Sequence, residues 1–177
     1  VAGYGNALKF KATVGSQASS VFSSSVAYTA PAITGLSVSG STMTTAGSQS
    51  ITITGTNFGP AVGANAIAAS YGGNSAADYD ATSCSVTTAN TIIKCTSAVG
   101  VGASHKWKVT LGGQTSALSS ATLSYTTAAI TGVTVSVGTL ATAGGESIVL
   151  AGSNFGPTSG HTVAVTYGGS DGALFTA

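Results

Sequence analysis

Charged side chains are scarce in this chain. Lys, Arg, Asp and Glu together make up 5% of its 177 residues, whereas an average soluble domain contains about 25%. The basic residues are all lysines, and the formal net charge is +1. Such a surface cannot neutralise a run of phosphates, which argues against nucleic-acid binding. It also lacks the charge that keeps monomers apart, so it suits a chain that packs against neighbours or carries glycans.

Long apolar runs and helical periodicity are missing as well. No apolar run approaches the ~20 residues that cross a bilayer, so we expect no membrane span. No 3.6-residue period persists for ten residues, which disfavours helices. The chain shows neither an initiator Met nor a signal peptide, and we expect it to be a mature or partial segment.

The residue patterns that mark catalytic or metal sites are absent too. Neither His105 nor His161 is framed by an orienting acid, so no Ser/His/Asp triad can be assigned. Asp78 and Asp80 could share a face, with Asp171 near the matching place in a later repeat, but solvated loop carboxylates are favoured over a weak calcium site. We therefore expect no enzymatic activity, no catalytic residues, no cofactor and no metal.

What the sequence does contain is a repeat at an offset of 97 residues. Residues 32–60 align without a gap with residues 129–157, and residues 3–19 align with residues 100–116. After a one-residue slip, SYGG at 70–73 matches TYGG further along the chain. The sequence thus predicts three segments, namely the C-terminal half of one repeat (1–30), a complete repeat (31–127) and the N-terminal half of another (128–177).

The complete repeat has an all-β pattern. In HKWKVTLG, Trp107 and Val109 point to one face and Lys106 and Lys108 to the other, as the two-residue period of a strand requires. About seven such strands, separated by Gly/Asn/Ser turns, predict an immunoglobulin-like β-sandwich.

Two near-identical hexapeptides, GTNFGP and GSNFGP, recur at the same offset. A phosphate-binding loop would need a Lys and a following helix, and neither is present. The structural interpretation accounts for each letter: Asn bonds its own backbone, Phe anchors the loop in the core, Gly permits positive φ and Pro stiffens the exit. The predicted structural-turn residues are Gly55, Asn57, Phe58, Gly59, Pro60, Gly152, Asn154, Phe155, Gly156 and Pro157.

Cys84 and Cys95 are the two cysteines of the chain, and they flank a turn sequence, TTAN. Their spacing suits two neighbouring strands, and two cysteines with two distant histidines make a poor zinc set. We expect a disulfide, which indicates an oxidising compartment and an extracellular or cell-surface location.

Taken in order, these motifs resemble the IPT/TIG domain, an immunoglobulin-like fold shared by plexins and transcription factors. The matching features are the Pro-x-Ile-x-Gly entry, the Gly-x-Asn-Phe-Gly turn, the paired cysteines and a Gly-x-Gly segment (Pro31, Ile33, Gly35, Gly55, Asn57, Phe58, Gly59, Cys84, Cys95, Gly100 and Gly102). The third repeat departs from the pattern, because Ala128 stands where the family favours Pro. The resemblance implies an early-set immunoglobulin-like sandwich, often found in tandem in extracellular proteins. It does not imply a catalytic activity.

Four of the five lysines form a recurring doublet, Lys9/Lys11 and Lys106/Lys108. They could form a solvated strand face that discourages strand-to-strand aggregation. They could instead contact an acid of a neighbouring domain, such as Glu146. The sequence leaves both interpretations open.

Glycosylation can be addressed only by motif and composition. No Asn-x-Ser/Thr sequon is present, so N-linked glycans are not expected. O-linked glycans on Ser/Thr clusters such as SSVFSSS at 19–25 remain a hypothesis from composition.

The two half repeats allow two interpretations. The chain could be a window on a longer tandem array. Alternatively, the halves of successive copies could combine into one shared sandwich that lacks the counterpart of about residues 81–97, joining copies head to tail. An incomplete sandwich would expose strand edges and core residues such as Phe10, Phe22, Tyr28, Ile148 and Phe155.

Both interpretations describe an elongated object, and we expect a structural, non-catalytic subunit of an extracellular filament or fibril that associates with itself. The alternative is a cell-surface adhesin or receptor stalk that binds glycan or protein through its loops. A binding loop is typically enriched in Trp, Tyr or Arg. The loops here are mostly Ala, Gly, Ser, Thr and Asn, which favours the structural role.

Overall fold

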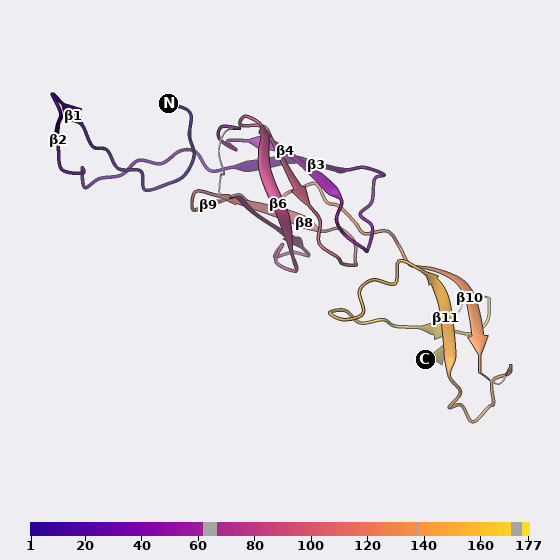
Figure 1. Ribbon diagram of the computed structural model, residues 1–177. Helices are drawn as coiled ribbons and strands as arrows, with labels where there is room; N and C mark the ends of the chain where they lie inside the picture. The colour runs from indigo at the N-terminus through magenta and orange to yellow at the C-terminus, as the bar shows by residue number, and fades with distance from the viewer. Residues whose placement is uncertain (62–66, 137, 171–174) are drawn as a thin grey trace.

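The computed structural model describes residues 1–61, 67–136, 138–170 and 175–177. A central sandwich lies between an extended N-terminal hairpin and a smaller C-terminal group of strands (Figure 1). We call these parts the arm (1–30), the central domain (31–127) and the C-terminal module (128–177). Every regular element in the described ranges is a β-strand, which confirms the predicted all-β class.

The central domain contains a seven-stranded sheet whose order is β3-β4-β7-β6-β5-β8-β9. All neighbouring strands are antiparallel. The strands are β3 (Ala32–Val38), β4 (Ser50–Thr56), β5 (Ile67–Gly72), β6 (Tyr79–Thr88), β7 (Ile92–Thr96), β8 (Lys106–Leu111) and β9 (Gln114–Thr115).

The long strand β6 folds this sheet into two layers. Residues 79–81 pair with β5, whereas residues 82–88 pair with β7. The alternation that predicts strand β8 is present, since its apolar residues are buried and its lysines are partly exposed. The fully buried side chains between the layers are Met43, Ile51, Ile53, Phe58, Tyr71, Ile93, Trp107, Val109 and Leu111. The predicted immunoglobulin-like sandwich is confirmed.

A disulfide joins the two strands of the β6–β7 hairpin. Cys84 in β6 is bonded to Cys95 in β7, as the cysteine spacing predicts. Cys95 is buried in the core. No helix in the described residues is long and apolar enough to cross a membrane.

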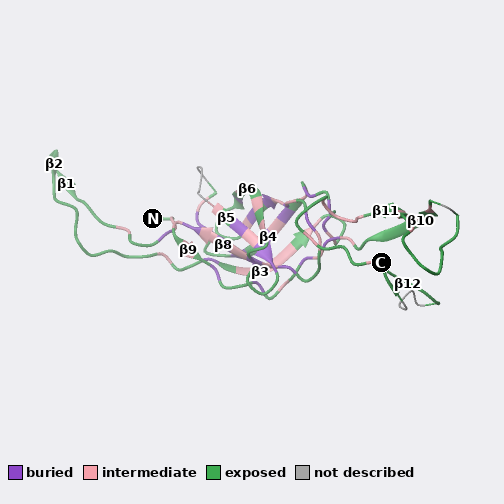
Figure 2. Ribbon diagram, turned by 90° about the horizontal axis from the view of Figure 1, so that it is seen from below, coloured by how far each residue is buried: buried purple, intermediate pink, exposed green. Residues whose placement is uncertain are grey.

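The arm and the C-terminal module contain shorter pairings. The arm ends in β1 (Thr13–Val14) and β2 (Gln17–Ala18), and the module contains β10 (Ala129–Val135), β11 (Ile148–Ser153), β12 (Thr166–Tyr167) and β13 (Phe175–Thr176). Figure 2 shows that burial is concentrated in the central domain, whereas the arm and the module are largely exposed. The described part of the chain therefore has one closed core with an open structure on either side.

Candidate functional site

Each histidine ring contacts residues of its own domain or module. His105 is buried, with its ring edge-on to those of Tyr71, Tyr79 and Tyr125, and its Nε2 lies 3.1 Å from the Val101 carbonyl oxygen. His161 Nε2 lies 2.9 Å from the carbonyl oxygen of Phe155, in its own loop.

One of the two neighbouring aspartates, Asp78, makes a local hydrogen bond. Asp78 Oδ2 accepts a hydrogen bond from the Gly73 N–H at 2.7 Å, which closes the turn after β5. Asp171 lies outside the described residues. Within the described ranges, no three His, Cys, Asp or Glu side chains are grouped so that they could hold a metal ion.

The recurring hexapeptide forms a turn in both copies. Phe58 is fully buried, and Asn57 and Gly59 have φ angles of 62° and 75°. The side-chain bond that the structure shows for each asparagine reaches outside the turn, to the segment that precedes the domain or module. Asn57 Nδ2 donates to the Ala30 carbonyl at 3.1 Å, and Asn154 Nδ2 donates to the Thr127 carbonyl at 3.3 Å. Each turn thus holds the segment that leads into its own domain or module.

The first position of the hexapeptide requires glycine, because the backbone of the neighbouring strand lies too close for a side chain. A Cβ at Gly55 would lie 2.1 Å from the Ala32 carbonyl oxygen and 2.3 Å from Phe58 Cζ. A Cβ at Gly152 would lie 2.0 Å from the Ala129 carbonyl oxygen. No larger residue fits at either position without displacing the neighbouring strand.

The lysine doublets and Glu146 lie in different settings. Lys106 and Lys108 are partly exposed on β8, and Lys9 and Lys11 are exposed on the arm. Glu146 Oε1 accepts a hydrogen bond from the Ala141 N–H at 3.1 Å, which closes a local turn. A contact between these lysines and a neighbouring acid stays a prediction.

The arm has the same backbone pairing as the β8–β9 hairpin of the central domain. Backbone hydrogen bonds join three residue pairs of the arm, namely 8 with 26, 10 with 22 and 12 with 19. The same bonds join the residues 97 positions later, namely 105 with 123, 107 with 119 and 109 with 116. Even a side-chain bond recurs: the N–H of Ala12 donates to Ser19 Oγ, and that of Val109 donates to Ser116 Oγ, both at 3.1 Å. The arm therefore holds this hairpin geometry without a sandwich around it.

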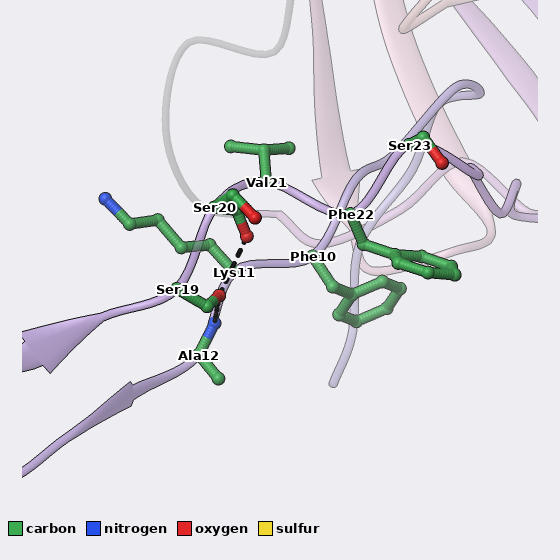
Figure 3. A pocket seen from close by; sticks show the side chains of 8 residues that line it. All are labelled: Phe10, Lys11, Ala12, Ser19, Ser20, Val21, Phe22 and Ser23. Carbon is green, nitrogen blue, oxygen red and sulfur yellow. Dashed lines mark hydrogen bonds between the residues drawn. The ribbon is translucent and has the colours of Figure 1, made fainter.

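The arm differs from its counterpart in exposure. Phe10 is 62% exposed, whereas Trp107, 97 positions later, is 0% exposed. Val14 and Val26 are also exposed, whereas their counterparts Leu111 and Leu123 are buried. In Figure 3 the rings of Phe10 and Phe22 project to the same side of the arm, and Lys11 extends away from them. One face of the arm is thus apolar and uncovered.

The C-terminal module is open on its corresponding face. An apolar cavity of about 250 Å³ is lined in part by Leu140, Ile148, Leu150 and Tyr167. Their counterparts in the central domain are all fully buried, namely Met43, Ile51, Ile53 and Tyr71. The rings of Tyr167 and Phe175 are 5.3 Å apart, as those of Tyr71 and Tyr79 are 5.2 Å apart. The module thus arranges part of a hydrophobic core, and the cavity marks the side that is left open.

The structure contains a buried pair of hydrogen-bonded tyrosines that the sequence analysis did not predict. Tyr71 Oη and Tyr125 Oη are 2.6 Å apart, Tyr125 Oη donates to the Ala98 carbonyl at 2.8 Å, and the Ala98 N–H donates to Tyr71 Oη. Burial raises the pKa of both phenols. The recurrence of Tyr125 as Tyr28 was a sequence signal that could have pointed to one member of this pair.

Comparison with known proteins identifies the family of the central domain. The family model of the IPT/TIG domain matches residues 31–127. No curated protein and no solved structure gave a significant match to the chain.

Proposed function

Because the chain belongs to the IPT/TIG domain family, whose immunoglobulin-like modules are typical of receptor and adhesion proteins, we propose that it is a structural, non-catalytic subunit of an extracellular filament or fibril. In this proposal the arm and the C-terminal module are two halves of an IPT/TIG domain. Each half packs against the other half from a neighbouring copy, which gives a shared sandwich without the counterpart of about residues 81–97, and the copies join head to tail.

One observation carries this proposal. Apolar side chains that occupy buried core positions of the central domain are exposed on the arm and around the cavity of the module. They are Phe10, Val14 and Val26 on the arm and Leu140 and Tyr167 on the module. Burial of apolar surface stabilises association by about 25 cal/mol per Å², and large exposed apolar faces are typical of interaction surfaces. The two faces differ, and the arm and the module that carry them lie on opposite sides of the central domain (Figure 1). Their pairing therefore does not close on itself and propagates as a filament.

Two further features support an extracellular assembly. The disulfide between β6 and β7 favours an oxidising compartment. The near absence of charge leaves little repulsion between copies. Ser20, Ser23 and Ser25 are exposed on the arm and correspond to exposed positions of the central domain. They would stay accessible in the filament, and we include O-linked glycans on them in the proposal as a coat.

The second candidate is a cell-surface adhesin or receptor stalk, which the family match favours. In that case the loops of the central domain would bind a glycan or protein, and the open faces would belong to further domains of a longer chain.

Electron microscopy of the native material, combined with the intact mass of the dissociated chain, separates these possibilities. Filaments built from chains near 16.9 kDa support the sharing of split domains between copies. Filaments built from a much heavier chain mean that residues 1–177 are a window on a tandem array. Discrete particles without filaments, at every concentration tested, would refute the structural role and favour the adhesin.

A further inference from the structure

We infer that the joint between copies repeats the β5–β8 pairing of the central domain, so that residues 163–168 of one chain pair antiparallel with residues 9–14 of the next. The occupant of the open module is thus the arm of a second copy of this chain. This inference rests on the proposed function and adds to it the register and the anchoring side chains.

The central domain supplies the template for the register. Strand β5 pairs with β8 so that Ile67 faces Leu111, Ser70 faces Lys108 and Tyr71 faces Trp107. The repeat carries β5 onto residues 163–168 and β8 onto residues 9–14. The corresponding partners are Val163 with Val14, Thr166 with Lys11, and Tyr167 with Phe10.

Phe10 is the anchor in this arrangement. In the central domain the rings of Trp107 and Tyr71 are stacked, with centroids 4.2 Å apart and planes 10° apart. Phe10 occupies the position of Trp107, and Tyr167, which lines the open cavity of the module, occupies that of Tyr71. Both are exposed in the single chain, Phe10 by 62% and Tyr167 by 41%. The joint would bury Phe10 against Tyr167, as the core of the central domain buries Trp107 against Tyr71.

A second contact follows from the tyrosine hydroxyls. Tyr28 Oη donates to the Val1 carbonyl at 2.7 Å, just as Tyr125 Oη donates to the Ala98 carbonyl. The remaining member of that network, Tyr71, corresponds to Tyr167. The arm therefore carries two members of the network and the module carries the third.

A third contact lies on the opposite layer. Met43 forms a parallel bridge with Tyr125, in which the Met43 N–H donates to the Ser124 carbonyl and the Thr126 N–H donates to the Met43 carbonyl. Leu140 is the counterpart of Met43, and it also lines the open cavity. The arm would thus be bonded along both of its segments, beside residues 163–168 through one and beside Leu140 through the other.

The free edge of β11 is the competing place for the arm. Strand β4 lies between β3 and β7, whereas β11 pairs with β10 alone among the described strands. An arm added at that edge would lie beside residues 148–153 and would leave Phe10 away from Tyr167. The two arrangements therefore predict different neighbours for Lys11.

Paired cysteines in the 177-residue chain test the register. Facing residues on neighbouring strands have Cβ atoms about 4.5–5.5 Å apart, close enough for a disulfide after small adjustment. The test variant is Thr166→Cys with Lys11→Cys. The matched control is Ala164→Cys with Lys9→Cys, which uses exposed positions that are four residues out of register. A third variant, Val149→Cys with Lys11→Cys, reports on the β11 edge.

We expect mild oxidation to link the test variant into a ladder of multimers on a non-reducing gel, with at least about ten times the yield of either other variant. Equal linking in the control, or linking only through Val149, would overturn the register while the proposed function stands. A disulfide within a single chain would overturn the joint between copies. If the unmodified chain shows no assembly by light scattering, both the inference and the proposed function fail.

Phe10→Ala gives an independent readout that does not depend on oxidation. Truncating a central aromatic anchor typically weakens an interface at least tenfold, so we expect the critical concentration for assembly to rise about tenfold or more. The unfolding temperature of the central domain should not change, because Phe10 is exposed in the single chain. Val99→Ala removes an exposed apolar side chain of the central domain and should change assembly less than about twofold. Assembly of Phe10→Ala at the unmodified concentration would contradict the anchor.

Discussion

Gly55, the first glycine of the hexapeptide in the central domain, has no room for a side chain. An added Cβ would overlap the Ala32 carbonyl oxygen and the Phe58 ring. We expect Gly55→Ala to lower the free energy of unfolding by about 1–3 kcal/mol, since backbone and ring must both shift. Gly35→Ala is the matched control in the paired strand, where the nearest atom would lie 3.7 Å away. Urea denaturation compares the two, and equal loss in both would contradict the steric explanation.

The buried tyrosine pair gives a dependence of stability on pH. Desolvation raises the pKa of Tyr71 and Tyr125 above the ordinary value of 10.0. Because the unfolded phenols ionise first, their stabilising contribution is fully present below about pH 10 and is lost as the pH rises above it. We expect the unfolding temperature of the central domain, followed by circular dichroism, to fall above about pH 10. Tyr125→Phe should flatten that fall, and Tyr167→Phe, at an exposed position, should not.

At this scale the sequence predicts residue types better than their partners. The hexapeptide pattern is enough to place Phe58 in the core and Gly59 at positive φ, because both follow from the local geometry of a turn. The partner of Asn57 is a carbonyl 27 residues earlier in the chain. Such a bond depends on how the incoming segment crosses the turn, and no local pattern encodes that crossing.

At the scale of elements, the β6–β7 hairpin is the part of the sandwich that is covalently fastened. Closing a loop of this length by a disulfide stabilises a domain by about 3 kcal/mol. We expect Cys84→Ala with Cys95→Ala to lower the free energy of unfolding of the central domain by about that amount. Guanidinium denaturation measures it, with the reduced unmodified chain as control. A change below about 1 kcal/mol would contradict the prediction.

The strands themselves are largely predictable from the sequence. Which strand belongs to which layer of the sandwich is not. Alternation in β8 and the turn signals between strands give the all-β class and the sandwich. That β6 serves both layers, with residues 79–81 beside β5 and residues 82–88 beside β7, depends on the register of several strands at once. The turn of the arm follows from local pattern, since Gly15 takes the positive φ of a hairpin. Its longer pairing, from residue 8 to residue 26, does not, because its apolar side chains are exposed in the described structure.

At the scale of the whole molecule, low charge sets how assembly responds to salt. With a net charge of +1 and Lys11 opposite Thr166 in the inferred register, the joint needs no ion pair. We expect the critical concentration to change less than about twofold between about 0.05 M and 0.5 M sodium chloride. Sodium sulfate should lower it, because that salt strengthens apolar burial. Light scattering measures both, and dissociation in sodium chloride would instead favour ion pairs through Lys9 and Lys11.

The unlike faces of the arm and the C-terminal module have a consequence for growth. A row of copies joined head to tail presents a free arm at one end and an empty module at the other, so the two ends are chemically different. Such a polymer has a direction, and its ends can elongate at different rates. A peptide with the sequence of residues 1–30 would occupy the empty module and stop elongation at that end alone.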